Sequence, residues 1–591
     1  MLTDEETKII TVEILVNGIS YDGKADTGAV MKSIGRDHKE LRPRMKVIKE
    51  DILNLIKEWN TKTLEDFRAK LQDLDPDKLA EIDKTKAEKP KKIDKESIYE
   101  LQDLPNVKKG KTIFRMAPYP SGALHIGNGR MAVLNDYYAK KYDGKLILVF
   151  DDTIGSDEKT IDEESYDLIR EGLKFLGVNY HQEVFKSDRL EIFYEYAEKL
   201  FDMEKLYVCT CPAEQWREEH KIPGIPCPCR IRTKADNNSL WEKMHNGDFQ
   251  PGEAVVRMKT GMEEQKDPAL RDQIAFRIST TKHVRVGNKY RVWPLLEFSW
   301  GIDDHLLGMT HIIRGIDLRK EGDIEKIIWD WFGWDHPEII LHGRVKTEGF
   351  SFSKSKDAQK IREGIYCGWD DPRTWSLQSL KRRGYLPKAI KNSVLALGLS
   401  PNAVKMSPVN LYHTNRELVD DNVNRIFGLD DKVSVLIKNV PANIPEQLEV
   451  SNHPTNESLG VHSIPLQKKD SGDIIIFIES HDAEFLKKDN FCRLMHLFNI
   501  KFEESSDNGI LATYYDNNVD FIKNNKYQFV QWLPEKHLTV PYTLEDGTVA
   551  EIYLEPEVQN YKKGTLFQLV RKAFVAIDEE KPNLSIIFSH T

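Results

Sequence analysis

The sequence predicts a mixed α/β fold with a Rossmann-like parallel sheet at its centre, and three observations favour it. A strand, a Gly/Pro-rich loop, a helix and a second apolar run follow one another between residues 111 and 150, which is the opening of a parallel α/β sheet. A cysteine-rich stretch near residues 209–230 then interrupts that rhythm. Beyond Met406, short alternating runs separated by turn residues indicate β-barrels or sandwiches.

Length and charge limit the class of protein. A chain of 591 residues exceeds what one hydrophobic core usually supports, since domains average roughly 150 residues. The net charge is −10 at pH 7, so any RNA contact must depend on local basic patches. No apolar run approaches the roughly 18 residues that span a bilayer, and the acidic N-terminus is unlike a signal peptide. The expected location is therefore the cytoplasm.

Residues 1–105 are predicted to form an N-terminal helical domain. The segment is charged, and apolar residues recur on one helical face, at Ile52, Leu53, Leu55, Ile56 and Trp59. It ends in the lysine-rich run from Lys84 to Lys92, which is either a solvated linker or an arm that contacts RNA. No catalytic motif occurs here. Docking to other proteins is a hypothesis for this domain.

Residues 106–205 are predicted to hold the first half of the Rossmann-like parallel sheet. Pro and Gly control the backbone of the loop between the strand Lys111–Arg115 and the helix that begins near His125. Free N–H groups and the helix dipole favour phosphates at that helix end. Gly127 would let a nucleotide base approach the backbone closely. The loop therefore predicts a nucleotide-phosphate site.

Residues 206–289 are predicted to form an inserted domain with a metal site. Two Cys-x-Cys pairs, Cys209 with Cys211 and Cys227 with Cys229, supply enough thiolates for a tetrahedral centre. Zinc fits a sulfur-only site without a redox task. A Cys-x-Cys pair is less diagnostic than Cys-x-x-Cys, so free thiols or partial ligation stay open as alternatives.

The remaining segments complete the predicted organisation. Residues 290–345 carry the second half of the parallel sheet, with apolar segments at 293–302 and 337–341. Residues 346–404 form a loop and a helix-rich part that includes the basic run Lys381-Arg382-Arg383, which is a solvated helix face or an RNA contact. Residues 405–591 contain the alternating runs 473–477, 511–515 and 566–570, and are predicted to form β-barrels.

Two short motifs resemble the signatures of class I aminoacyl-tRNA synthetases. His125-Ile-Gly-Asn128, preceded by Ala117-Pro-Tyr-Pro-Ser-Gly, resembles the HIGH signature with Asn in place of its final His. Ser351-Phe-Ser-Lys-Ser resembles the KMSKS loop with Ser351 replacing its first Lys. The resemblance implies that His125 and Lys354 are catalytic and stabilise charge on the α-phosphate of ATP. The implied ATP-binding residues are Pro120, Ser121, Gly122, His125, Gly127, Asn128, Ser353 and Lys354.

From about Lys111 to the C-terminus the chain resembles the archaeal-type glutamyl-tRNA synthetases. The residues that carry this resemblance are Arg115-x-Ala-Pro, Phe150-Asp-Asp-Thr and the segments 303–314 and 368–373. It implies that Arg115 and Asp151 bracket the amino acid at the carboxyl ends of parallel strands, where ligands bind in such sheets. The implied substrate-binding residues are Arg115, Ala117, Tyr119, Asp151 and Arg314.

Arg314 discriminates between the two closest activities. Glutamate carries a side-chain carboxylate, which a guanidinium matches with two bonds, whereas glutamine carries an amide. Related glutaminyl enzymes usually have Cys at the matching position, so Arg314 favours glutamate. The alternative for this residue is a salt-bridged structural arginine. The family often has Tyr where this chain has Leu296, so a tyrosine contact to substrate is not expected.

The predicted function is therefore that of a glutamate–tRNA ligase. The resemblance implies a class I catalytic domain with an inserted zinc-containing acceptor-binding domain and C-terminal β-barrels that bind the anticodon. Glutamate and ATP with Mg²⁺ give glutamyl-adenylate, and the glutamyl group passes to the 3′-terminal adenosine of tRNA(Glu). The zinc would be structural. Charging of tRNA(Gln) stays open, and the alternatives are a glutaminyl-tRNA synthetase and a non-catalytic tRNA-binding relative.

Overall fold

The computed structural model describes residues 2–20, 23–38, 41, 44–79, 100–154, 160–347, 353–507 and 509–591. The chain divides into two compact units, Met1–Ile98 and Tyr99–Thr591. The predicted linker Lys84–Lys92 and position Ser351 of the second signature lie outside the described residues. None of the described helices is both long and apolar enough to cross a membrane.

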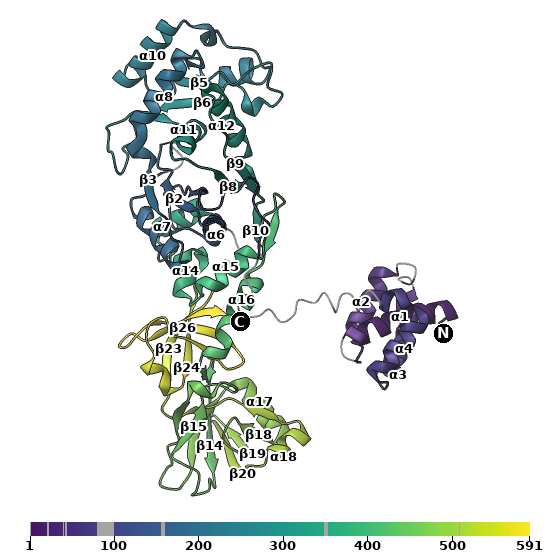
Figure 1. Ribbon diagram of the computed structural model, residues 1–591. Helices are drawn as coiled ribbons and strands as arrows, with labels where there is room; N and C mark the ends of the chain where they lie inside the picture. The colour runs from purple at the N-terminus through teal and green to yellow at the C-terminus, as the bar shows by residue number, and fades with distance from the viewer. Residues whose placement is uncertain are drawn as a thin grey trace. The chain divides into compact units, whose positions relative to one another are not determined.

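The first unit is helical in its described part (Figure 1), as the periodicity predicts. Ile52 and Ile56 are buried in its apolar core together with Phe67 and Leu71 of the fourth helix. That last helix begins with a capping box, in which the Thr63 and Asp66 side chains bond each other's backbone N–H groups. The helices are α1 (Asp4–Ser20), α2 (Thr27–Asp37), α3 (Met45–Trp59) and α4 (Leu64–Leu74).

The second unit opens with the parallel sheet that the sequence predicts. Its first half has the strand order β1-β2-β3, and a second parallel pair, β8-β9, lies beside β1. The Thr310 N–H group donates to the carbonyl of Ile113 at 3.1 Å and joins the two halves. The elements are β1 (Ile113–Met116), α6 (Ile126–Lys141), β2 (Lys145–Phe150), α7 (Glu164–Phe175), β3 (Gln182–Phe185), β8 (His311–Gly315), α12 (Arg319–Phe332) and β9 (Glu338–His342).

An inserted module separates the two halves of this sheet, as predicted. It contains a four-stranded antiparallel sheet in the order β4-β5-β6-β7, and its buried strands pack on the long helices in a shared core. The helix α11 returns the chain to the parallel sheet, and its Trp300 and Asp304 contact Arg115 of β1. The elements are α8 (Leu190–Asp202), β4 (Leu206–Cys209), α9 (Ala213–Gln215), α10 (Lys234–Asn246), β5 (Val255–Met258), β6 (Ile274–Ile278), β7 (Val292–Pro294) and α11 (Leu296–Leu306).

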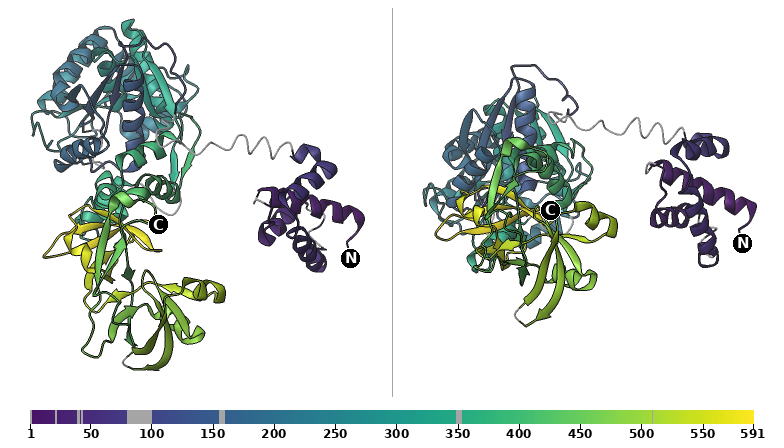
Figure 2. Two further views of the ribbon diagram at one scale, coloured as in Figure 1. Left: turned by 60° about the horizontal axis from the view of Figure 1, so that its bottom comes forward. Right: turned by 90° about the horizontal axis from the view of Figure 1, so that it is seen from below.

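A helical segment follows and connects the catalytic half to the C-terminal sheets. Figure 2 shows the yellow C-terminal strands lying against these green helices. Arg382 forms two bonds of 2.7 Å with Asp578, and Arg383 is fully buried and donates to the carbonyl of Ser589 at 2.8 Å. The elements are β10 (Val345–Thr347), α13 (Lys354–Arg362), α14 (Leu377–Arg382), α15 (Pro387–Leu395), β11 (Val404–Met406) and α16 (Pro408–Val419).

The basic run at residues 381–383 is therefore chiefly structural. Two of its three side chains are engaged in bonds within the protein, and only Lys381 is exposed. The sequence leaves two alternatives for this run, a solvated helix face and an RNA contact. For Arg382 and Arg383 the structure favours neither of them. They instead hold the helical segment on the C-terminal strands.

Two seven-stranded, barrel-like sheets make up the C-terminal part, as the alternating runs predict. The proximal sheet has the order β12-β25-β26-β27-β23-β24-β13, with strands Arg425–Ile426, Leu566–Leu569, Ala573–Glu579, Ser585–His590, Leu538–Thr543, Val549–Leu554 and Gly428–Leu429. The distal sheet has the order β21-β18-β19-β20-β14-β17-β22, with strands Gln528–Val530, Phe491–Leu494, Asn499–Ser506, Gly509–Asp516, Val433–Lys438, Ile474–Ile478 and Leu533–Pro534.

The distal sheet is inserted within the proximal one. All of its strands lie in the sequence between β13 and β23, together with the hairpin β15 (Gln447–Ser451) and β16 (Val461–Pro465) and the helices α17 (Ser480–Asp489) and α18 (Val519–Asn525). The chain passes from the proximal to the distal sheet near Lys432 and returns near His537. These two crossings lie side by side, because Lys432 Nζ and His537 Nε2 are 3.0 Å apart.

Candidate active site and metal centre

His125 forms the N-cap of helix α6. Its Nδ1 accepts the backbone N–H of Asn128 at 3.2 Å, so a neutral ring carries its proton on Nε2. Burial, and then the nearby Lys354, lower the pKa of His125 to about 3. At neutral pH this residue is therefore an uncharged hydrogen-bond donor at the start of a helix, where the helix dipole favours an anion.

The two signature segments meet at Gly122. This glycine has φ +138°, and a Cβ atom there would lie 2.2 Å from the Trp369 ring, so only glycine fits. The Lys354 Nζ donates to the Gly122 carbonyl at 3.3 Å. Burial lowers the pKa of Lys354 to about 8. Ser353 caps the helix that Lys354 begins, accepting the Lys356 N–H at 3.5 Å.

A cavity of about 440 Å³ lies at the carboxyl ends of the parallel strands. Seven of the residues predicted from the sequence line it: Arg115, Ala117, His125, Gly127, Asn128, Asp151 and Arg314. Asn128 Oδ1 is buried and has no hydrogen-bond partner among the described residues. Leu296, at the position where the family often has Tyr, is the first residue of α11 and also lines the cavity.

Six predicted residues do not line this cavity. Tyr119 lies close to Asp151 and Asp152, and burial and these two carboxylates raise its pKa. The loop residues Pro120 and Gly122 are buried and Ser121 is partly buried, so they shape the loop before α6. Lys354 reaches this loop through Gly122, whereas Ser353 lines a separate cavity with Tyr366 and Arg373.

Arg115 is held in place by an acidic and an aromatic side chain of α11. Its Nε and Nη2 atoms both bond to the Asp304 carboxylate, the latter at 2.8 Å. The guanidinium carbon also lies 3.5 Å from the ring centroid of Trp300, a favourable cation–π position. Because these contacts fix the guanidinium on the cavity wall, Arg115 presents a preorganised cation.

Arg314 forms a buried pair with Glu325 of α12. Nη1 and Nη2 donate to the two carboxylate oxygens at 2.9 and 2.5 Å, and Glu325 is fully buried. Burial raises the pKa of Glu325, and Arg314 opposes that effect. Arg314 Nε is buried without a hydrogen-bond partner among the described residues. Glu325 thus fixes the guanidinium, and a second carboxylate, that of Asp304, lies 3.8 Å from Nη2.

The structure adds four residues to the site that the motifs did not single out: Lys186, Trp300, Asp304 and Glu325. Asp304 stands within the segment 303–314 that carries the resemblance, but sequence gives no sign that it pairs with Arg115, 189 positions earlier. Lys186 directly follows strand β3, which ends at Phe185. A lysine at the carboxyl end of a parallel strand is a signal that sequence analysis could have used.

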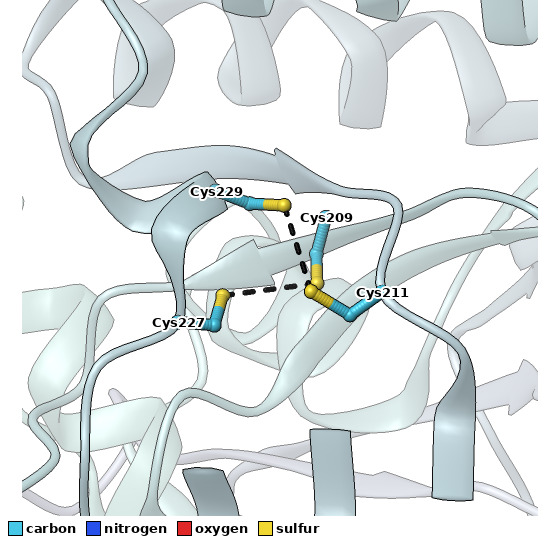
Figure 3. Close-up of side chains that lie close together, drawn as sticks. All are labelled: Cys209, Cys211, Cys227 and Cys229. Atoms are coloured by element: carbon cyan, nitrogen blue, oxygen red, sulfur yellow. Dashed lines mark hydrogen bonds between the residues drawn. The ribbon is translucent and has the colours of Figure 1, made fainter. Parts of the chain in front are cut away.

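Four cysteine sulfurs converge in the inserted module (Figure 3). Cys209 ends β4, and the Sγ atoms of Cys209, Cys211, Cys227 and Cys229 all lie within 4.8 Å of one another. The pairs Cys209–Cys227 and Cys211–Cys229 are 4.0 and 3.7 Å apart. Zn–S bonds of about 2.3 Å put tetrahedral sulfurs about 3.8 Å apart, so this set is compatible with a zinc ion.

Known families match most of the second unit. The family described as "tRNA synthetases class I (E and Q), catalytic domain" matches residues 111–421, and its "anti-codon binding domain" matches residues 423–516. The chain belongs to this family of class I synthetases for glutamate and glutamine. The resemblance inferred from the two signatures, and the predicted class I fold with barrel-like C-terminal sheets, are thereby confirmed.

Curated relatives match over nearly the whole chain. Proteins named glutamate–tRNA ligase from Pyrococcus furiosus and Pyrococcus horikoshii are 38% and 39% identical, each over 99% of this chain and over 100% and 99% of their own lengths. The one from Methanocaldococcus jannaschii is 37% identical over 97% of this chain and 98% of its own. A solved glutamate-tRNA synthetase from Elizabethkingia anophelis has a TM-score of 0.40 at 21% identity, covers 52% of this chain and 71% of its own, and is too distant to inform the fold.

Proposed function

We propose that this chain is a glutamate–tRNA ligase, which forms glutamyl-adenylate from glutamate and ATP and transfers the glutamyl group to tRNA(Glu). Full-length relatives with that name support the activity. The observation that carries the choice of amino acid is Arg314, which lines the same cavity as His125 and Asp151 and whose buried Nε has no hydrogen-bond partner among the described residues. The reaction would take place in the cytoplasm, where translation consumes charged tRNA.

At the phosphate end, the proposed roles follow from charge and hydrogen bonding. The α-carboxylate of glutamate attacks the α-phosphorus of ATP, and negative charge builds on the non-bridging oxygens. The His125 imidazole would donate from the start of α6, and Lys354 would add a cation from α13. ATP would bind as its Mg²⁺ complex. Gly127 and Asn128 lie beside His125 in the cavity and would contact the nucleotide.

At the amino-acid end, three charged side chains would orient glutamate. Arg314 would bond the side-chain carboxylate through its Nε edge, because Glu325 already occupies the other nitrogens. Asp151 would face the ammonium group of glutamate, and Arg115 would bind its α-carboxylate. Ala117 would complete the cavity wall, and Tyr119, which lies close to Asp151 but does not line the cavity, would support that wall. This orientation leaves the α-carboxylate directed toward the helix start at His125.

Pyrophosphate exchange tests the function directly. With glutamate, ATP and tRNA present, labelled pyrophosphate should enter ATP, whereas glutamine in place of glutamate should give far less exchange. Exchange with glutamine alone would instead identify a glutaminyl-tRNA synthetase. No exchange with either amino acid would favour a non-catalytic tRNA-binding relative. Charging of purified tRNA(Glu) and tRNA(Gln) in parallel would then decide whether the second tRNA is also a substrate.

The proposed division of tRNA binding follows the predicted domains. Residues 206–289 would hold the acceptor stem, residues 346–404 would contact the stem below it, and residues 405–591 would read the anticodon. The catalytic halves would be residues 106–205 and 290–345. For the helices in residues 1–105 we keep the proposal of docking to another translation protein, which a pull-down with and without these residues would test.

We also propose that Cys209, Cys211, Cys227 and Cys229 bind a structural zinc ion. Replacing Cys227 by serine should remove the metal, because a tetrahedral site needs all four sulfurs, and should lower the melting temperature of the inserted module. Metal analysis of the purified wild type should give about one zinc per chain. Cys367→Ser is the matched control, since this thiol is exposed and lies outside the cluster. Retention of zinc by Cys227→Ser would contradict the proposal.

A further inference from the structure

Lys186 is a fully buried lysine beside the candidate active site. It follows β3 directly, and its side chain has 0% exposure. Its Nζ lies 3.0 Å from Asp151 Oδ1, donates to Ser299 Oγ at 2.7 Å, and lies 3.6 Å from the ring centroid of Trp300. A buried ammonium group without partners would be very costly, so these three contacts are what allow a charge here.

The parallel strands explain why Lys186 and Asp151 meet. Phe150 of β2 pairs with Phe185 of β3 in register, so the next residue of each strand emerges at the same sheet edge. The contact between Lys186 and Asp151 is therefore set by the pairing of the two strands rather than by a flexible side-chain conformation. It forms wherever β2 and β3 are paired, and the cation stands ready before any substrate arrives.

The surroundings of Lys186 are densely charged. The charged groups that face it are Asp151 at the end of β2, Arg115 of β1, and Glu297 and Asp303 of α11. Asp303 is in turn paired with Arg189 at 2.7 Å. Burial lowers the pKa of Lys186, and the carboxylates of Asp151 and Asp303 oppose that effect. Lys186 thus neutralises the carboxylate of Asp151, the same carboxylate that would face the ammonium group of the substrate.

Lys186 does not line the active-site cavity, but two of its partners do. Asp151 and Trp300 both form its wall. The Asp151 Oδ1 atom is buried, and it forms the ion pair with Lys186. Lys186 thus contacts the Asp151 carboxylate from its buried side, while Asp151 itself lines the cavity. Trp300 meanwhile contacts the cations of both Lys186 and Arg115.

We propose that Lys186 is a positioning residue that fixes Asp151 and Trp300 for the ammonium end of the amino-acid substrate, and so sets the affinity for glutamate without touching it. The inference rests on the proposed function. It concerns the part of the substrate that all amino acids share. It is therefore separate from the choice between glutamate and glutamine that Arg314 makes.

The test compares Lys186→Met with wild type in pyrophosphate exchange, using whichever amino acid the wild type activates. The expected result is a rise in KM for the amino acid of about 30-fold or more, because one partner of a buried charge pair is lost, with KM for ATP changed by less than about threefold. A side chain that only stabilised the fold would raise both constants together or lower the amount of active enzyme. Lys391→Met is the matched control, since Lys391 also pairs with an aspartate, Asp136, at 3.6 Å, but away from the cavity.

Two further measurements keep the inference falsifiable. If Lys186→Met does not fold, Lys186→Gln keeps a hydrogen-bond donor without the charge and is expected to show the same selective rise in KM. In Lys186→Ala, added methylammonium should lower KM for the amino acid back toward wild type. Unchanged kinetics, or equal rises in both KM values, would overturn the role of Lys186. Absence of exchange by the wild type would overturn the proposed function instead.

Discussion

Replacing Lys354 by methionine should slow glutamyl-adenylate formation by about 100- to 1,000-fold, the usual cost of removing one group that stabilises transition-state charge. Lys354 is the cation assigned to the second signature, because Ser351 stands where the family has its first lysine. The contact of its Nζ with Gly122 links it to the loop before His125. Single-turnover formation of the adenylate measures this step without tRNA transfer.

The pH dependence gives an internal control for Lys354. Burial lowers its pKa to about 8, so the free enzyme loses this cation as the pH rises through about 8. The value of kcat/KM for ATP, which reports groups of the free enzyme, should therefore fall on the alkaline side. In Lys354→Arg the cation persists and the alkaline fall should disappear. If kcat/KM for ATP in Lys354→Arg still falls at the same pH, the fall reports the titration of another group.

Replacing Arg314 by cysteine should lower kcat/KM for glutamate by a factor on the order of 10³, because a fixed, desolvated partner of the side-chain carboxylate is lost. The same change leaves Glu325 buried without its cation, which should reduce the free energy of unfolding by about 3–5 kcal/mol. Pyrophosphate exchange and denaturant unfolding, measured on one preparation, report the two effects.

The double variant Arg314→Cys with Glu325→Gln separates these effects. Removing the unpaired carboxylate should restore part of the stability, while glutamate activation should stay low. Recovery of glutamate activation in the double variant would show that Arg314 acts only through the fold. In the single variant the loss of stability should grow as the pH rises above 4.5. Burial raises the pKa of Glu325 in the folded state, so the folded protein must give up this proton, and become less stable, as the pH rises.

Local patterns carried most of the fold. The apolar stretch of β2 and the loop before His125 predicted the parallel sheet, because strand, loop and helix follow one another within about 40 residues, as in other such sheets. The inserted module was visible from its cysteines, and the C-terminal sheets from alternating runs such as that of β17. The insertion of the distal sheet within the proximal one was not visible, because strand partners more than 100 residues apart leave no local pattern.

The candidate site was predicted in part. Arg115, Asp151 and Arg314 were singled out because the resemblance to the glutamyl-tRNA synthetases implies that they bind the amino acid, and all three line one cavity. Their partners Asp304 and Glu325 could not be assigned, since a carboxylate on a helix has no special sequence context until the helix is placed. For the same reason the sequence could not show that Arg382 and Arg383 bond to Asp578 and Ser589.

The paired crossings at Lys432 and His537 make the distal sheet a cassette. A chain that leaves one domain and returns to the same spot needs only a short bridge to close after the intervening segment is taken out. Such a segment can be lost, exchanged or lengthened during evolution while the strand order of the proximal sheet stays intact. Lys432 and His537 are therefore suitable fusion points for replacing the distal sheet in order to change which nucleic acid it binds.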